Sequence, residues 1–289
     1  MIKKSYITPF FIAITGYVCM VSMDTSIKIL GNNYPIYQLL FLNAIFSLIP
    51  ISFFVLKFHG ISFYKKQNYK FQLIRGVIHS AGFLFLLKGI ILLPLSAVYP
   101  ILFSSPLILL VLSHFFLKDH INIVRVSAII SGFIGVVISA EPFGENSIST
   151  LGALFVFLGA IFIAIVSLIT RKFSALASSY ETSFFSMAIS SIIFLFAMSS
   201  NFELMSIKDL SISMMGGFFA GFGVMAIIHG ARVLPASIFG MTSYFQLLYG
   251  VLLGWLFFYQ LPTIQNIIGI SFVMIAGFLL FILDKQKTN

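Results

Sequence analysis

One apolar stretch, interrupted by prolines, lies between Pro94 and Lys118 and holds no Asp, Glu, Lys or Arg. A run of about 20 apolar residues is enough to cross the hydrocarbon core of a bilayer as a helix. Pro94 suits the start of such a helix, whereas Pro100 and Pro106 remove backbone donors inside it and leave carbonyls free. In lipid, free backbone groups are tolerated only where they face protein or water. The stretch therefore predicts a bent or broken transmembrane helix that lines a wet space.

The same pattern returns in the second half of the chain, from Leu234 to Gln260. The two copies share a Leu-Pro-x-Ser start and keep a constant offset. The recurring positions are Leu93 and Leu234, Pro94 and Pro235, Ser96 and Ser237, Leu107 and Leu248, Leu112 and Leu253, Phe116 and Phe257, and upstream Gly82 and Gly223, Gly89 and Gly230. We interpret this as an internal duplication, which changes the expected fold.

Composition places the chain in the membrane. It is 60% hydrophobic and 9% charged, with a mean hydropathy of +1.08, whereas a soluble domain carries roughly 25% charged residues. Lys3 and Lys4 precede the first apolar run without a small-residue cleavage site, so we expect that run to stay as the first transmembrane helix. The single cysteine, Cys19, forms no intramolecular disulfide, and no zinc-ligand spacing or P-loop is present.

Ten apolar spans can be drawn, so we predict an all-α polytopic membrane protein. They cover 7–30, 34–56, 72–93, 95–117, 122–140, 149–170, 177–199, 212–233, 235–258 and 264–283. The duplication divides them into two five-helix repeats, residues 1–140 and 149–289. Because five is odd, the two repeats enter the membrane from opposite sides, an inverted arrangement that usually builds secondary transporters with a site near mid-membrane.

The positive charges fix an orientation. With the N-terminus inside, all but three of the 17 Lys and Arg residues fall on cytoplasmic flanks, the exceptions being Lys28, Lys88 and Lys208. Such asymmetry is typical of cytoplasmic loops and accounts for the net charge of +9 without nucleic acid. We expect both termini in the cytoplasm. Inversion places Lys88 and its counterpart His229 near opposite mouths of one cavity, as gating or coupling residues.

Ionisable residues at membrane depth are costly and become candidates for function. Asp24 and Lys28 are one helical turn apart, so they can pair on one face of the first span. They are interpreted as an interfacial ion pair or as an outer gate with a proton-sensitive carboxylate. His79 shares a helical face with Gly82, Phe83 and Leu86, and either carries a coupling proton or packs as a neutral residue. It is also a candidate for substrate binding.

Polar groups near the middle of the two echoed spans are candidates for substrate binding. Ser105 has Gln246 as its counterpart, and Phe103 has Tyr244. The alternative for each is a hydrogen bond between helices. The prolines nearby favour a cavity wall. The candidates on these spans are Tyr99, Ser104, Ser105, Tyr244 and Gln246.

Several segments make the chain similar to the ten-helix EamA-type members of the drug/metabolite transporter superfamily. They are MDTSIKILGNNYP (23–35), IRGVIHSAGFLFLLKGIILLPLSAVYPILFSSPL (74–107), GFIGVVIS (132–139), GARVLPAS (230–237) and LLGWLFFYQLP (252–262). The resemblance covers nearly the whole chain. It implies two inverted five-helix halves around a central cavity in a bacterial inner membrane.

The resemblance also implies a function class. Asn43 stands where the family often carries an arginine, and it joins the substrate-binding candidates. The expected function is efflux of an amino acid or related metabolite by alternating access, with proton coupling and exchange both open. Uptake of a nucleoside-like or methyl-donor metabolite is the alternative. A membrane-embedded enzyme needs carboxylates in register, which this chain lacks, and a non-transporting scaffold needs no cavity. We expect no cofactor, no metal, and a monomer or homodimer in the bilayer.

Overall fold

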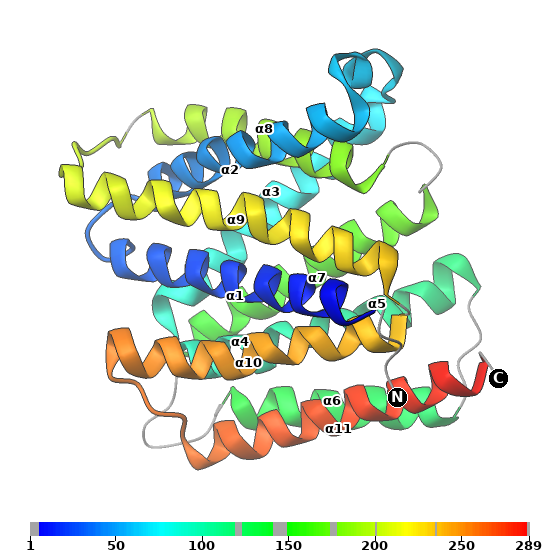
Figure 1. Ribbon diagram of the computed structural model, residues 1–289. Coiled ribbons are helices and arrows are strands. Elements are labelled where there is room, and N and C mark those ends of the chain that lie inside the picture. Colours follow the sequence, from blue (N-terminus) through cyan, green and yellow to red (C-terminus); the bar gives the residue numbers. More distant parts are fainter. Residues whose placement is uncertain are drawn as a thin grey trace.

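The computed structural model describes residues 6–118, 123–140, 149–173, 178–199, 201–234 and 236–287, and in this part of the chain all regular structure is helical (Figure 1). The elements are α1 (Ile7–Leu30), α2 (Ile36–His59), the 3-10 helix η2 (Ile61–Lys66), α3 (Tyr69–Leu92), α4 (Leu95–Leu102), α5 (Ser104–Leu117), α6 (Ile123–Ser139), α7 (Thr150–Lys172), α8 (Ser179–Met198), α9 (Ile207–Val233), α10 (Ala236–Phe258) and α11 (Ile264–Lys287). The all-α prediction is confirmed.

The helices match the ten expected spans. Among the described residues, eight helices are long and apolar enough to cross a membrane, with α4 and α5 counted together as one. The remaining two, α6 and α11, contain shorter apolar stretches over Val126–Ser139 and Ile264–Gly277. The chain is therefore a multi-pass membrane protein.

The fourth span is broken at Phe103, between α4 and α5, and not at a proline. The amide of Phe103 still donates to the carbonyl of Tyr99 at 2.9 Å, which ends the first helix. Three residues later, Pro106 has no N–H to offer the carbonyl of Leu102, and its ring excludes that carbonyl from a regular turn. Proline is tolerated in a first helical turn, so the chain restarts as α5 at Ser104 and keeps Pro106 there.

The main helix contacts join the two halves of the chain. In Figure 1, α1 lies along α9, α3 along α7, α2 along α8, and α6 along α11. By position in the two halves, α1 is equivalent to α7, and α3 is equivalent to α9. The contact of α1 with α9 therefore becomes the contact of α7 with α3 when each helix is exchanged for its equivalent in the other half. The contacts of α2 with α8 and of α6 with α11 are unchanged by that exchange. Two five-helix halves related by a twofold axis would make this pattern.

The repeated glycines allow these contacts to be close. A Cβ atom on Gly223 of α9 would lie 2.9 Å from the carbonyl oxygen of Gly16 on α1. A Cβ atom on Gly89 of α3 would lie at the same distance from the carbonyl oxygen of Gly152 on α7. Without side chains at these positions the helix backbones can approach, which is the usual role of small residues between membrane helices.

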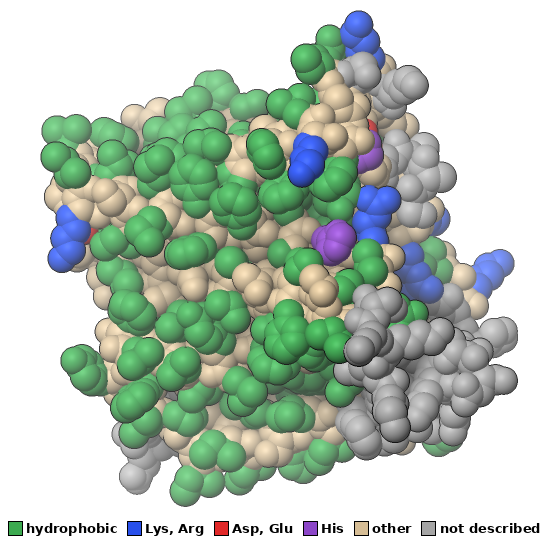
Figure 2. Space-filling model, in the orientation of Figure 1, with side chains coloured by type: hydrophobic (Ala, Val, Ile, Leu, Met, Phe, Trp, Pro, Cys, Tyr) green, Lys and Arg blue, Asp and Glu red, His purple; other side chains and the backbone are tan. Residues whose placement is uncertain are grey.

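The bundle has two different ends. Helix α1 begins and α11 ends on the same side of the bundle, at the right in Figure 1, and Lys and Arg side chains gather there in Figure 2. We call this end the basic face; its exposed cations include Lys57, Lys65, Lys70, Lys172 and Arg232. The other end is called the opposite face, and it carries Lys208 and Asp209 at the start of α9. There the hydroxyl of Tyr34, in the turn after α1, donates to the Asp209 carboxylate at 2.8 Å, and this bond raises the pKa of Tyr34.

Candidate functional site

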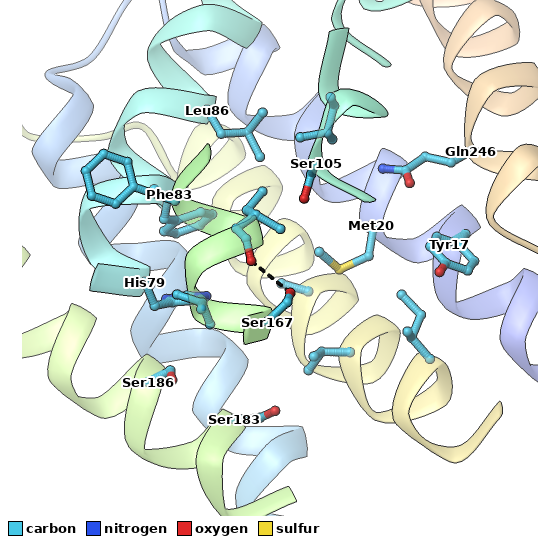
Figure 3. Close-up of a pocket in the computed structure, with 18 of the residues that line it drawn as sticks. Tyr17, Met20, His79, Phe83, Leu86, Ser105, Ser167, Ser183, Ser186 and Gln246 are labelled. Carbon is cyan, nitrogen blue, oxygen red and sulfur yellow. Dashed lines mark hydrogen bonds between the residues drawn. The ribbon is translucent and has the colours of Figure 1, made fainter. Parts of the chain in front are cut away.

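A cavity of about 580 Å³ lies among helices α1 to α5 of the first half and α7 to α10 of the second half. Ligand pockets in proteins span roughly 300–1,000 Å³, so a small metabolite fits. Most of the wall is apolar or aromatic, including Phe83, Phe103, Phe162 and Phe239. Polar lining residues are fewer, and Figure 3 shows several of them around the space: Tyr17, His79, Ser105, Ser167, Ser183, Ser186 and Gln246.

Arg75 is a charged residue on this wall that the sequence did not single out. Its side chain is 9% exposed and lies in the second turn of α3, although the sequence assigned it to a cytoplasmic flank. Its Nε donates to the hydroxyl of Thr170 at 2.7 Å, and its Nη1 donates to the Thr182 carbonyl at 2.9 Å and to the hydroxyl of Ser186. In the described part of the chain, Nη2 has no hydrogen-bond partner and no carboxylate lies within 4.0 Å of the guanidinium. The cavity wall therefore holds a cation without a counter-ion.

His79 lies one turn further along α3 and lines the cavity with Gly82, Phe83 and Leu86, as its helical face predicted. Its Nδ1 is 3.4 Å from the hydroxyl of Ser190, and its ring stacks on Phe83 with centroids 6.0 Å apart. The ring is therefore held against the wall as a flat surface. Whether it carries a coupling proton stays a prediction.

Asp24 and Asn43 are polar residues on the wall that are almost fully buried, at 3% and 1% exposure. One carboxylate oxygen of Asp24, Oδ2, accepts a hydrogen bond from the hydroxyl of Tyr99 at 2.9 Å. The other oxygen has no protein partner, and neither does either polar atom of the Asn43 amide. Buried polar atoms usually have partners, so such a group of unpartnered atoms calls for an explanation.

The expected ion pair between Asp24 and Lys28 does not form, and neither residue lies at an exposed interface. Lys28 is 7% exposed, and its Nζ donates to the carbonyls of Ile90, at 2.8 Å, and Leu93. These carbonyls lie at the end of α3, where Pro94 has no N–H with which to continue the helix. Helix C-termini attract cations, so the tertiary contact wins over the i,i+4 pair.

The structure brings only some of the candidates on the echoed spans to the cavity. Ser105 and Gln246 line it from α5 and α10. Ser104 is fully buried between helices, and Tyr99 is fully buried with its hydroxyl on Asp24. Tyr244 stacks on its own sequence counterpart, Phe103, with ring centroids 5.5 Å apart, which joins the two halves at α5 and α10.

Lys88 and His229 lie outside the cavity lining. Each is near the last turn of its helix, α3 or α9, and these two helices end at opposite faces of the bundle (Figure 1). The Lys88 ammonium lies 5.6 Å from the centre of the Phe155 ring. The expected separation of the two residues is thus present, but neither contacts the space that they were expected to gate.

The cavity is sealed toward the opposite face. There Leu30, Leu93, Leu95 and Tyr99 are buried to 1% exposure or less. Toward the basic face, Gly240 lines the cavity at the position equivalent to Tyr99, and a Cβ atom there would meet nothing within 4 Å. The cavity reaches Arg75, Ser183 and Ser243, all near the helix ends at the basic face.

Further lining residues escaped the sequence reasoning because serine in a membrane helix is a weak signal. Ser167, Ser183, Ser186 and Ser243 all line the cavity, together with Tyr17. The available signal was position: Ser186 occupies the same place in α8 as Asn43 in α2, counted from the helix starts. Among the described residues, no three His, Cys, Asp or Glu side chains come together to hold a metal ion.

The family model for EamA-like transporters matches the chain twice, over residues 8–140 and 150–282. The chain belongs to the EamA-like transporter family. It is 24% identical to an S-adenosylmethionine uptake transporter of Rickettsia conorii, over 98% of this chain and 95% of the relative. It is 22% identical to the pseudopaline exporter CntI of Pseudomonas aeruginosa, over 88% of this chain and 89% of the relative.

A crystal structure shares the fold of this EamA-like protein. The two chains superpose with a TM-score of 0.68 over 99% of each, at 15% sequence identity. The family and the names of its relatives indicate a membrane transporter of small molecules rather than an enzyme. Bacterial relatives of this kind support a place in the inner membrane.

Proposed function

We propose that this EamA-like protein is a secondary transporter for a small amphoteric metabolite of the S-adenosylmethionine class. The observation that carries the proposal is the uncompensated guanidinium of Arg75 on the wall of a cavity of ligand size. A buried charge without a partner is costly, so an anionic group on the substrate is its natural complement. Arginine binds carboxylates through paired N–H groups, and Nη2 is still available for this.

The rest of the wall suits the other parts of such a molecule. The stacked pair of His79 and Phe83 presents a flat aromatic surface, on which a nucleoside base can lie. The aromatic wall as a whole also attracts an organic cation, through the negative face of each ring. These features favour the methyl-donor alternative over a simple amino acid, and the relative from Rickettsia conorii is named for that substrate.

We further propose that transport occurs by alternating access of two inverted repeats, residues 1–140 and 149–289. Helix contacts that are preserved when the halves are exchanged support this arrangement. By the positive-inside rule, the basic face is cytoplasmic and so are both termini. The present conformation is then open toward the cytoplasm and closed outside. Because the cavity lies within one chain, a monomer is the transport unit.

The direction of transport that we propose is uptake. It follows the Rickettsia conorii relative, while the Pseudomonas aeruginosa relative supports export of an amphoteric product as the second candidate. Uptake and export can be distinguished with protein reconstituted into liposomes and labelled S-adenosylmethionine supplied on one side of the membrane. Accumulation driven by unlabelled substrate on the far side indicates exchange, and accumulation driven by a pH gradient alone indicates proton coupling.

The first prediction concerns Arg75. We expect Arg75→Gln to lower the uptake of labelled S-adenosylmethionine about tenfold or more, because a hydrogen bond to a charged group contributes roughly 1.5–3 kcal/mol. The matched control is Arg232→Gln, which removes an exposed arginine outside the cavity. Uptake that is equal in wild type and Arg75→Gln would refute the role of Arg75. A wild-type protein that moves neither S-adenosylmethionine nor any other amphoteric metabolite would refute the proposed function.

A further inference from the structure

The unpartnered atoms of Asp24 and Asn43 belong to one wall of the cavity. Both residues line it, and both are more than nine-tenths buried. The carboxylate oxygen Oδ1 and the two polar atoms of the amide have no partner among the described residues. Two of these atoms, the Asp24 carboxylate oxygen and the Asn43 amide oxygen, are acceptors, and only the Asn43 Nδ2 is a donor, so a group with positive charge or N–H donors complements this wall.

In the second half of the chain, the residues equivalent to Asp24 and Asn43 do have hydrogen-bond partners. Counted from the helix starts, Ser167 in α7 is the counterpart of Asp24 in α1, and Ser186 in α8 is the counterpart of Asn43 in α2. All four line the cavity. The hydroxyls of Ser167 and Ser186 donate to backbone carbonyls of their own helices, at 2.8 Å each. The cavity thus has two equivalent sites of different chemistry.

The cations are distributed unequally between these two sites. Arg75 donates to Ser186 in one site. By the constant offset that relates Gly82 to Gly223, the counterpart of Arg75 is Gly216, which lies close to the Asn43 amide in the other site. An arginine does not fit there, because a Cβ atom on Gly216 would collide with the hydroxyl of Ser26. The site at Asp24 and Asn43 therefore has a carboxylate but no arginine, whereas the equivalent site at Ser167 and Ser186 has the arginine.

The neighbouring charged residue does not supply that cation. Lys28 is on the same helix as Asp24, but its ammonium is held by the carbonyls at the end of α3. Tyr99 donates to one carboxylate oxygen only, and that bond holds the carboxylate in place. The second carboxylate oxygen, Oδ1, is left available to a ligand that enters the cavity.

We propose that Asp24 and Asn43 form the subsite for the positively charged group of the substrate, a sulfonium or an ammonium. This assignment rests on the proposed function and names the substrate class more closely, as a metabolite with a cationic group and a carboxylate. The cation pairs with Oδ1 of Asp24, and the Asn43 amide oxygen accepts from an ammonium or faces the methyl groups of a sulfonium. Arg75 holds the carboxylate, closer to the basic face.

The test uses charged thiol reagents and needs no substrate. In a Cys19→Ser background, Met20→Cys places one thiol in the cavity, a turn before Asp24 on the same helix (Figure 3). Its rates with trimethylammonium-ethyl and sulfonatoethyl methanethiosulfonate are each divided by the rate for a free thiol. We expect the cationic reagent to be favoured about tenfold or more, because a charged cleft raises the local concentration of counter-ions.

Substitutions assign the preference to the proposed residues. Asp24→Asn should bring the ratio of the two rates close to one, and Asn43→Asp should raise it, while Asp209→Asn, a carboxylate outside the cavity, should leave it unchanged. A ratio near one in the Met20→Cys protein itself would overturn the cation subsite, even if Asp24→Asn failed to fold. Since the reaction is independent of transport, failure of the liposome assay would count against the proposed function and leave this result standing.

Discussion

At the scale of single residues, Tyr99 decides which oxygen of Asp24 faces the cavity. Its ring is fully buried against α10, where Gly250 leaves room for it, and its hydroxyl reaches the Oδ2 atom of Asp24. A side chain this enclosed cannot turn away without disturbing its surroundings. The phenol therefore acts as a fixed donor that holds the carboxylate at the cavity wall.

This contact gives a prediction for Tyr99→Phe. The ring stays, the hydrogen bond is lost, and the free energy of unfolding should fall by about 1 kcal/mol, near the value for polar contacts between membrane helices. Unfolding in mixed detergent with increasing denaturant measures the change. Tyr17→Phe is the matched control, because the Tyr17 hydroxyl has no hydrogen-bond partner among the described residues. Equal losses in the two variants would show that the bond to Asp24 contributes nothing specific.

The partners of individual side chains were the part that the sequence could not predict. Asp24 and Lys28 were expected to pair because they are neighbours on one helix, yet both are bound by segments some 60 to 75 residues away. The sequence places Arg75 on a cytoplasmic flank, because it is close to the start of its helix, whereas the structure buries it against α7 and α8. The partner of a buried side chain depends on which other helices pack against its own helix, and the spacing of residues along one helix does not show this.

At the scale of elements, the prolines of the fourth span place a cavity wall where a straight helix would close it. Phe103, Ser105 and Pro106 all line the cavity at the break between α4 and α5. The break was expected from the sequence, although its position at Phe103 was not. Most helix ends were predicted within a few residues, but α9 begins earlier than expected, because Ser206 caps it by accepting from the amide of Asp209.

The break should matter for transport more than for stability. Pro106→Ala supplies an N–H for the Leu102 carbonyl, so we expect α4 and α5 to join into one helix and the transport rate to fall about tenfold, with stability unchanged or higher. Transport in liposomes and unfolding in detergent measure the two effects. Pro9→Ala is the control, since Pro9 lies in the first turn of α1, where its amide has no helical partner. A normal rate in Pro106→Ala would mean that the break is only a packing feature.

At the scale of the whole molecule, the number of spans and the basic face could be predicted from the sequence, because apolar length and charge act locally. The pairing of helices across the two halves could not, since nothing in a single apolar helix states which neighbour it will meet. The structure also shows that the two halves differ at equivalent positions. Val98 is fully buried at the sealed end, whereas Phe239, its counterpart in the second half, lines the cavity.

That asymmetry gives a prediction about the transport cycle. In a Cys19→Ser background, a thiol at Phe239→Cys should react readily with a large, water-soluble maleimide added at the basic face, and a thiol at Val98→Cys should not react from either side. Exchanging the conformations of the two halves opens the opposite end and closes the present one, so transported substrate should make Val98→Cys reactive from the opposite face and slow the labelling of Phe239→Cys. This reciprocal change is what alternating access requires, because a cavity open at both ends would dissipate a gradient. If both thiols became reactive together, the protein would behave as a channel, and the two halves would not be exchanging conformations.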